Sequence, residues 1–201
     1  MARPREFNRD QAVDQAVETF WDLGYESTST AVLVDRLGIA KSSLYAAFGS
    51  KDDLYTEAMD RYIEGLRTRA IEPLRADGPA MEVLRDFFRR AAVRWIPEGE
   101  RLRCCMVVRA SLAGSDQPPA IRQRTRQAIA ELDDAFYALL RRARDEESLP
   151  PSLGLRGTAR FLTTTYQALN IAALAGRDRR ELREIVDCAL ATLAPGQGAS
   201  Q

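Results

Sequence analysis

The sequence predicts an all-α protein of about nine helices, with an N-terminal three-helix helix-turn-helix domain followed by a C-terminal helical domain. Apolar residues recur at i, i+3 and i+4 along most of the 201 residues, whereas the alternation typical of strands is almost absent. Glycines and prolines interrupt this pattern at helix-length intervals. We expect domains at residues 1–55 and 56–195, and a disordered tail at 196–201.

Four helices are expected in the first third of the chain, and the second and third are short. The first carries an apolar stripe that includes Ala16 and Phe20, and single glycines end the first three. Ser50 is expected to cap the fourth helix, where Asp52 and Asp53 suit the positive end of the helix dipole. The expected ranges are Arg9–Leu23, Ser29–Leu37, Ala40–Phe48 and Ser50–Leu74.

Five further helices follow. Prolines open two of them, and Asp178 with Glu181 forms a capping box before the last. Apolar stripes predict that the last two helices pack within the chain and also against a partner. The expected ranges are Pro79–Trp95, Leu102–Leu112, Pro118–Glu146, Leu155–Ala175 and Arg179–Leu193.

The chain contains no histidine, which excludes Ser-His-Asp and Cys-His catalysis as well as histidine-dependent zinc sites. Three cysteines without an apolar leader indicate a reducing compartment, and no run of residues is apolar enough to span a membrane. We therefore expect a cytoplasmic protein without a metal or cofactor. The acidic cluster Glu131, Asp133 and Asp134 is interpreted as a solvated helix face, so an enzyme on a helical scaffold is disfavoured.

The helices predicted at Ser29–Leu37 and Ala40–Phe48 are joined by a glycine turn and fit a helix-turn-helix. The second is too short to be stable alone, as expected of a recognition helix braced by its neighbours. Its exposed positions would carry small or polar groups able to approach base edges in a major groove. Those positions are Lys41, Ser42, Ser43, Tyr45 and Ala46, and Lys51 after Ser50 could hold a phosphate.

The stretch GYESTSTAVLVDRLGIAKSSLYAAFGSKDDLY, from Gly24 to Tyr55, resembles the DNA-binding motif of the TetR family of bacterial transcription regulators. The resemblance implies a homodimer formed through the last two helices. It further implies a repressor that binds a palindromic double-stranded DNA operator. A small-molecule inducer would release this repressor from the operator. It places DNA contacts at Thr28, Ser29, Lys41, Ser42, Ser43, Tyr45, Ala46 and Lys51.

Three features depart from the family pattern. Ala40 stands where a Ser or Thr often caps the recognition helix, and Ala46 and Ala47 stand where His or Tyr is common. Residues 1–60 hold six basic and eleven acidic side chains, a net charge of −5. We therefore expect modest non-specific DNA affinity, to which Arg3, Arg5 and Arg9 could contribute.

An inducer pocket is expected between the helices of the C-terminal domain, lined by apolar side chains and a few polar ones. Aromatic residues at helical spacing are core residues by default, so the polar residues within apolar helices are more informative. The predicted lining comprises Phe88, Trp95, Met106, Arg109, Phe136, Tyr166 and Asn170.

Two alternatives remain open from the sequence. Cys104 and Cys105, at the start of a short helix near Arg101 and Arg103, could form a redox or electrophile sensor in place of a non-covalent site. Their apolar surroundings favour inert buried thiols, and Cys188 is expected in the core or at an interface. A ligand-free structural DNA-binding or adaptor protein is the second alternative.

Overall fold

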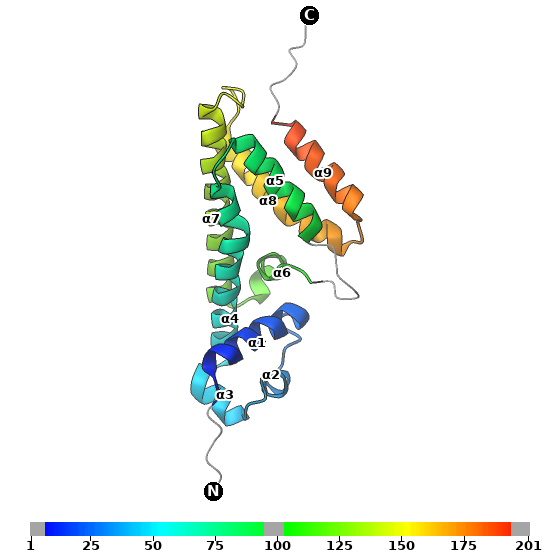
Figure 1. Ribbon diagram of the computed structural model, residues 1–201. Coiled ribbons are helices and arrows are strands. Elements are labelled where there is room, and N and C mark those ends of the chain that lie inside the picture. Colours follow the sequence, from blue (N-terminus) through cyan, green and yellow to red (C-terminus); the bar gives the residue numbers. More distant parts are fainter. Residues whose placement is uncertain (1–6, 95–102, 194–201) are drawn as a thin grey trace, which may run out of the picture. The chain divides into compact units, whose positions relative to one another are not determined.

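The computed structural model describes residues 7–94 and 103–193, which contain nine α-helices (Figure 1). The all-α prediction is confirmed. Within the described ranges, no helix is long and apolar enough to cross a membrane. The helices are α1 Arg9–Leu23, α2 Thr30–Leu37, α3 Lys41–Phe48, α4 Lys51–Leu66, α5 Ala80–Arg94, α6 Met106–Ala113, α7 Pro119–Asp145, α8 Leu155–Leu174 and α9 Arg179–Ala191.

Side-chain caps explain several of the helix starts. The Asn8 carboxamide oxygen accepts a hydrogen bond from the Gln11 amide at the start of α1. At α9 the predicted capping box is complete: Asp178 accepts from the Glu181 amide at 2.9 Å, and Glu181 accepts from the Asp178 amide at 2.9 Å. Each cap satisfies amide groups that the first helical turn leaves without an intrahelical acceptor.

The prediction that the fourth helix continues to Leu74 as a regular α-helix is wrong. Regular α4 ends at Leu66, and the chain continues as a π-helical turn at Arg67–Ile71 and a 3₁₀ turn at Glu72–Arg75. Pro73 has no amide hydrogen to donate to the Arg69 carbonyl, which instead accepts from Arg94 Nη2 at 3.2 Å. Arg67 fixes the π-helical turn through two hydrogen bonds to Glu131 of α7, at 2.8 and 2.9 Å.

The described residues form two compact units. The first combines the residues up to Gly65 with Cys105–Thr125, so it contains α1–α4, α6 and the start of α7. The second begins at Leu66 and contains α5, most of α7, α8 and α9. This division differs from the predicted boundary between residues 55 and 56, because α4 continues beyond Tyr55 and α6 groups with the N-terminal helices.

The core of the second unit is built around four aromatic rings. Phe88 and Phe136 are fully buried and stack with ring centroids 5.8 Å apart. Phe87 packs edge-on against Phe136 and also contacts Tyr166 of α8. Aliphatic side chains from α5, α7, α8 and α9 surround the rings, among them Leu84, Leu140, Leu162, Leu169 and Leu182.

Candidate nucleic-acid interface

The helix-turn-helix predicted from the sequence is present as α2, a three-residue turn and α3. The Ser29 hydroxyl accepts from the Val32 amide at the start of α2, and Gly38 ends this helix in the left-handed conformation with φ +63°. Ala40 precedes α3 without a side-chain cap, as its apolar side chain predicts. Four buried apolar residues join the two helices to their neighbours: Leu33, Leu37, Leu44 and Phe48.

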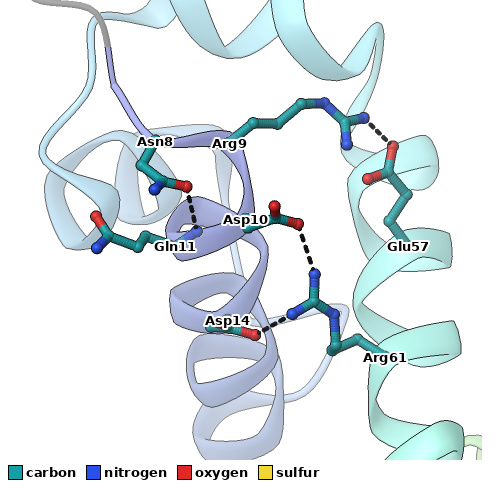
Figure 2. A network of polar contacts seen from close by, with 7 residues as sticks. All are labelled: Asn8, Arg9, Asp10, Gln11, Asp14, Glu57 and Arg61. Atoms are coloured by element: carbon teal, nitrogen blue, oxygen red, sulfur yellow. Dashed lines mark hydrogen bonds and ion pairs between the residues drawn. The ribbon is translucent and has the colours of Figure 1, made fainter.

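Ion pairs hold α1 against α4, the helices that brace α2 and α3 (Figure 2). Arg61 of α4 donates to Asp10 at 2.8 Å and to Asp14 at 2.9 Å. Arg9 pairs with Glu57 at 2.5 Å, and its guanidinium also lies 4.9 Å from the centre of the Phe48 ring. Because these pairs are well exposed, they orient the helices more than they stabilise them.

The outward face of α3 carries most of the predicted DNA-contacting residues. Lys41, Ser42, Tyr45 and Ala46 are exposed, and Ser43 is half-buried. Tyr45 exposes 42% of its surface, and its hydroxyl lies 3.4 Å from the Thr30 hydroxyl of α2. A small and polar helix face of this kind can enter a major groove without steric conflict. Ser29 is exposed at the start of α2, where it can contact a phosphate.

The positions of Thr28 and Lys51 revise their predicted roles. Thr28 is fully buried, and its hydroxyl donates to the Gly24 carbonyl at 2.6 Å, so this side chain braces a turn and is not offered to DNA. The Lys51 ammonium donates to the Tyr25 carbonyl at 3.1 Å and lies 3.9 Å from the centre of the Tyr25 ring. Lys51 therefore anchors the α1–α2 turn to the start of α4, and the residue is half-buried.

Tyr25 and Tyr55 stack at 4.8 Å beside this lysine. The Tyr25 hydroxyl donates to Asp52, and burial followed by this hydrogen bond raises the pKa of Tyr25. Burial likewise raises the pKa of Tyr55 to about 12, which the Arg109 guanidinium partly opposes. Sequence reasoning assigned Arg109 to the inducer pocket. Arg109 belongs to the first unit, where a Cβ placed on Gly24 would be 3.3 Å from its Nη1 atom.

We expect the stability of the protein to fall between pH 10 and pH 12, and part of the fall to come from Tyr55. In the unfolded chain Tyr55 ionises near pH 10, whereas the folded protein retains its proton up to about pH 12. The protonated Tyr55 side chain contributes its full stabilisation below pH 10. As the pH rises from 10 to 12, ionisation of Tyr55 in the unfolded chain lowers the free energy of unfolding by on the order of 2 kcal/mol. Urea unfolding at pH 9.5 and pH 12 measures it. Tyr55→Phe should lose less than wild type, and an equal loss in both proteins would contradict the assignment.

The predicted inducer-pocket residues are divided between the two units. Phe88, Phe136, Tyr166 and Asn170 are buried in the second unit, whereas Met106 and Arg109 belong to the first, and Trp95 lies outside the described residues. The amphipathic pattern correctly identified buried positions but could not separate core from pocket, because both are apolar at helical spacing.

Thr163 of α8 is a buried polar residue that the sequence analysis did not include among the predicted pocket residues. Thr163 is 1% exposed, and its hydroxyl has no hydrogen-bond partner among the described residues. Its neighbour Thr164 is exposed, and its hydroxyl donates to the Arg160 carbonyl at 2.8 Å. A buried hydroxyl without a partner is costly unless another molecule satisfies it. The apolar neighbours Leu162 and Tyr166 gave the only hint that position 163 faces inward.

The two vicinal cysteines are buried at 3% and 4% exposure. Cys104 donates its thiol proton to the Asn170 carboxamide oxygen at 3.0 Å. This bond favours the protonated thiol, whereas sensing chemistry requires an accessible thiolate. Cys188 is exposed on α9, so the predicted core location is wrong for the single protomer and the interface location remains.

The acidic cluster of α7 does not form a catalytic pair. Arg67 holds the pKa of Glu131 below its ordinary value through direct hydrogen bonds, which outweigh the opposing effect of burial. Asp134 pairs with Arg156 at 2.5 Å. A general acid would need a raised carboxyl pKa, which Glu131 lacks.

Comparisons with known proteins cover most of the chain. Residues 12–58 match the family of bacterial regulatory proteins named after TetR, and residues 80–189 match the tetracyclin repressor-like C-terminal domain. The uncharacterized HTH-type regulator YezE of Bacillus subtilis is 32% identical over 96% of this chain and 100% of its own length. The repressor ComR of Escherichia coli is 30% identical over 94% of this chain and 90% of its own.

Solved structures agree with these matches. The TetR family regulator CifR, solved as a cysteine mutant with 26-base-pair double-strand operator DNA, superposes with a TM-score of 0.82. It is 32% identical over 94% of this chain and 98% of its own. The sequence matches span both units, and the helix-turn-helix geometry agrees with them. The chain therefore belongs to the TetR family of bacterial transcriptional regulators.

Proposed function

We propose that this protein is a homodimeric repressor that binds a palindromic operator through α3 of each protomer. Binding of a small molecule releases the repressor from the operator. The observation that carries this proposal is the exposed face of α3 on a braced helix-turn-helix. The similarity to the repressor ComR supports repression as the direction of regulation, and the similarity to CifR, solved with operator DNA, supports DNA as the partner. Dimerisation would place two recognition helices in successive major grooves, which makes a palindromic operator the natural target.

An exposed stripe on α8 supports dimerisation with a second copy of the chain. Six exposed residues, which are named below, recur along the chain at alternating spacings of four and three. This spacing is typical of a helix face that packs against another helix. Phe161 is 44% exposed and Ile171 is 43% exposed. We define the α8 seam as Gly157, Phe161, Thr164, Ala168 and Ile171 of α8 with Ala175 directly after the helix, all of which are exposed. On α9, exposed Cys188 would continue the same interface.

Replacing Ile171 by glutamate is expected to convert the dimer to monomers, because each protomer would bring an unpaired carboxylate into the shared seam. We expect the dimer dissociation constant, measured by sedimentation equilibrium, to rise at least about 100-fold. Leu112→Glu places the same charge on an exposed apolar residue outside the seam and should leave the dimer intact. A dimer that tolerates Ile171→Glu would contradict the proposed interface.

We place the inducer beside α8 in the second unit, where Thr163 and Asn170 bring polar groups into an apolar core. The inducer would be an apolar molecule with at least one hydroxyl or carbonyl group that bonds to Thr163. It would favour a conformation whose recognition helices are wrongly spaced for DNA, and this shift requires that it bind that conformation more tightly. Because both cysteines are buried and the Cys104 thiol donates its proton to Asn170, non-covalent release is preferred to thiol sensing.

Thr163→Val is expected to reduce the response to such an inducer while preserving the shape of the core. Candidate apolar alcohols and ketones are screened for release of a labelled operator duplex. For an active compound, loss of one hydrogen bond should raise the half-release concentration up to about tenfold. Thr158→Val is the control, since the Thr158 hydroxyl already donates to the Gly154 carbonyl. Equal responses from the two variants would remove Thr163 from the site.

A further inference from the structure

A charged groove lies between α5 and α9 in the second unit, where the two helices run side by side (Figure 1). Its volume is about 620 Å³. None of its residues belongs to the α3 face, the α8 seam or the buried residues assigned to the inducer. We define the α5–α9 groove by its lining residues: Asp86, Arg89, Arg90, Val93, Arg94 and Arg183.

Positive charge in this groove is not neutralised by the protein. Four guanidinium groups face one carboxylate, and Asp86 already pairs with Arg89 at 2.8 Å. Arg90 and Arg183 form no ion pair with a described residue. The groove thus carries a local charge of +3, although the net charge of the whole chain is zero.

Some arginines of the second unit outside the groove have carboxylate partners. Arg180 of α9 lies 3.8 Å from Glu184, and Arg142 of α7 lies 3.6 Å from Glu146. What distinguishes the groove is that four arginines gather there around a single carboxylate, Asp86. Accumulated like charge raises the free energy of the empty groove, and a bound anion would lower it.

The two helices hold the groove in a defined shape. Val83 and Phe87 of α5 and Leu182 and Val186 of α9 are buried in the common core, so the helix backbones below the arginines are fixed by packing. Each guanidinium offers a planar fork of donors that matches two oxygens of a phosphate or carboxylate group. Arginines anchored on opposite sides can contact two anionic groups of one ligand.

We propose that the α5–α9 groove binds a small oxyanion with two or more negative charges, such as a molecule with linked phosphate or carboxylate groups. Arg90 and Arg183 contact it from opposite helices, and Arg89 and Arg94 supply further positive potential. This site shares no residue with the DNA-binding face or with the proposed inducer site. The regulator therefore has a second small-molecule site, specific for charge instead of apolar shape.

Isothermal titration of the full chain with inorganic pyrophosphate, at an ionic strength held constant with sodium chloride, tests this proposal. We expect saturable binding with one pyrophosphate per protomer. The double variant Arg90→Gln with Arg183→Gln should weaken it at least about tenfold, because two charge-assisted contacts are lost. Citrate as a second probe distinguishes preference for phosphate from preference for carboxylate, and binding of either that depends on these two arginines supports the site.

The matched control is Arg126→Gln with Arg141→Gln, which removes two positive charges from exposed positions of α7 outside the groove. This variant should bind pyrophosphate within about twofold of wild type. The salt screens the two removed charges from the groove, and the groove arginines themselves are unchanged. Urea midpoints equal to wild type establish that both double variants are folded. Absence of saturable binding of both probes to wild type, or equal weakening in the two double variants, overturns the proposal.

Discussion

Replacing Ser42 by glutamate is expected to weaken sequence-specific DNA binding at least about 100-fold. Ser42 is exposed in the first turn of α3, the helix that we place in the major groove. A carboxylate there would face the negative potential of the phosphates and would be desolvated against base edges. The same carboxylate suits the positive end of the α3 dipole, so the helix itself should remain folded.

Fluorescence anisotropy with an operator duplex measures this effect at one stated salt concentration. Ser152→Glu provides the control, because it adds the same charge at an exposed position in the turn between α7 and α8. The control should bind DNA within about threefold of wild type. If both variants lose affinity equally, the change in net charge is responsible and α3 is not the reading helix.

Replacing Phe88 by alanine is expected to lower the free energy of unfolding by about 3–5 kcal/mol. Phe88 is fully buried and contacts Phe87 and Phe136, so truncation leaves a cavity that rigid helices cannot close. Leu112→Ala, at a residue with 69% exposure, should change stability by no more than about 0.5 kcal/mol. Urea unfolding at fixed protein concentration compares the variants.

A loss of less than about 1 kcal/mol for Phe88→Ala would contradict this packing. It would indicate that the side chain borders an existing cavity and would return Phe88 to the inducer pocket predicted from the sequence. The measurement thus decides between two roles that the sequence pattern alone could not separate.

Local signals determined most of the helix boundaries that the sequence predicted. Gly38 and Gly49 end helices because they adopt positive φ, and the Asp178–Glu181 capping box fixes the start of α9. The end of α4 was missed because its irregularity depends on Pro73 together with a distant donor, Arg94. Long-range contacts of this kind leave no periodic signal in the sequence.

Site residues were predictable where exposure follows from helical position. Ser42 and Tyr45 are exposed on α3 as expected, and the family assignment agrees that this regulator is not an enzyme. The roles of Thr28 and Arg109 could not be decided from the sequence, because a polar side chain in an apolar setting can serve structure or function. Only tertiary contacts show that Thr28 braces a turn and that Arg109 approaches Gly24.

The most direct test of operator recognition is selection of bound sequences from a random duplex library, followed by affinity measurements at several salt concentrations. We predict enrichment of a palindromic consensus whose half-sites are about one helical turn apart. Affinity should fall with salt, and the slope should be modest because few cations face DNA from the acidic N-terminal residues. If no sequence is enriched by the ligand-free dimer, the central claim of operator recognition through α3 is contradicted.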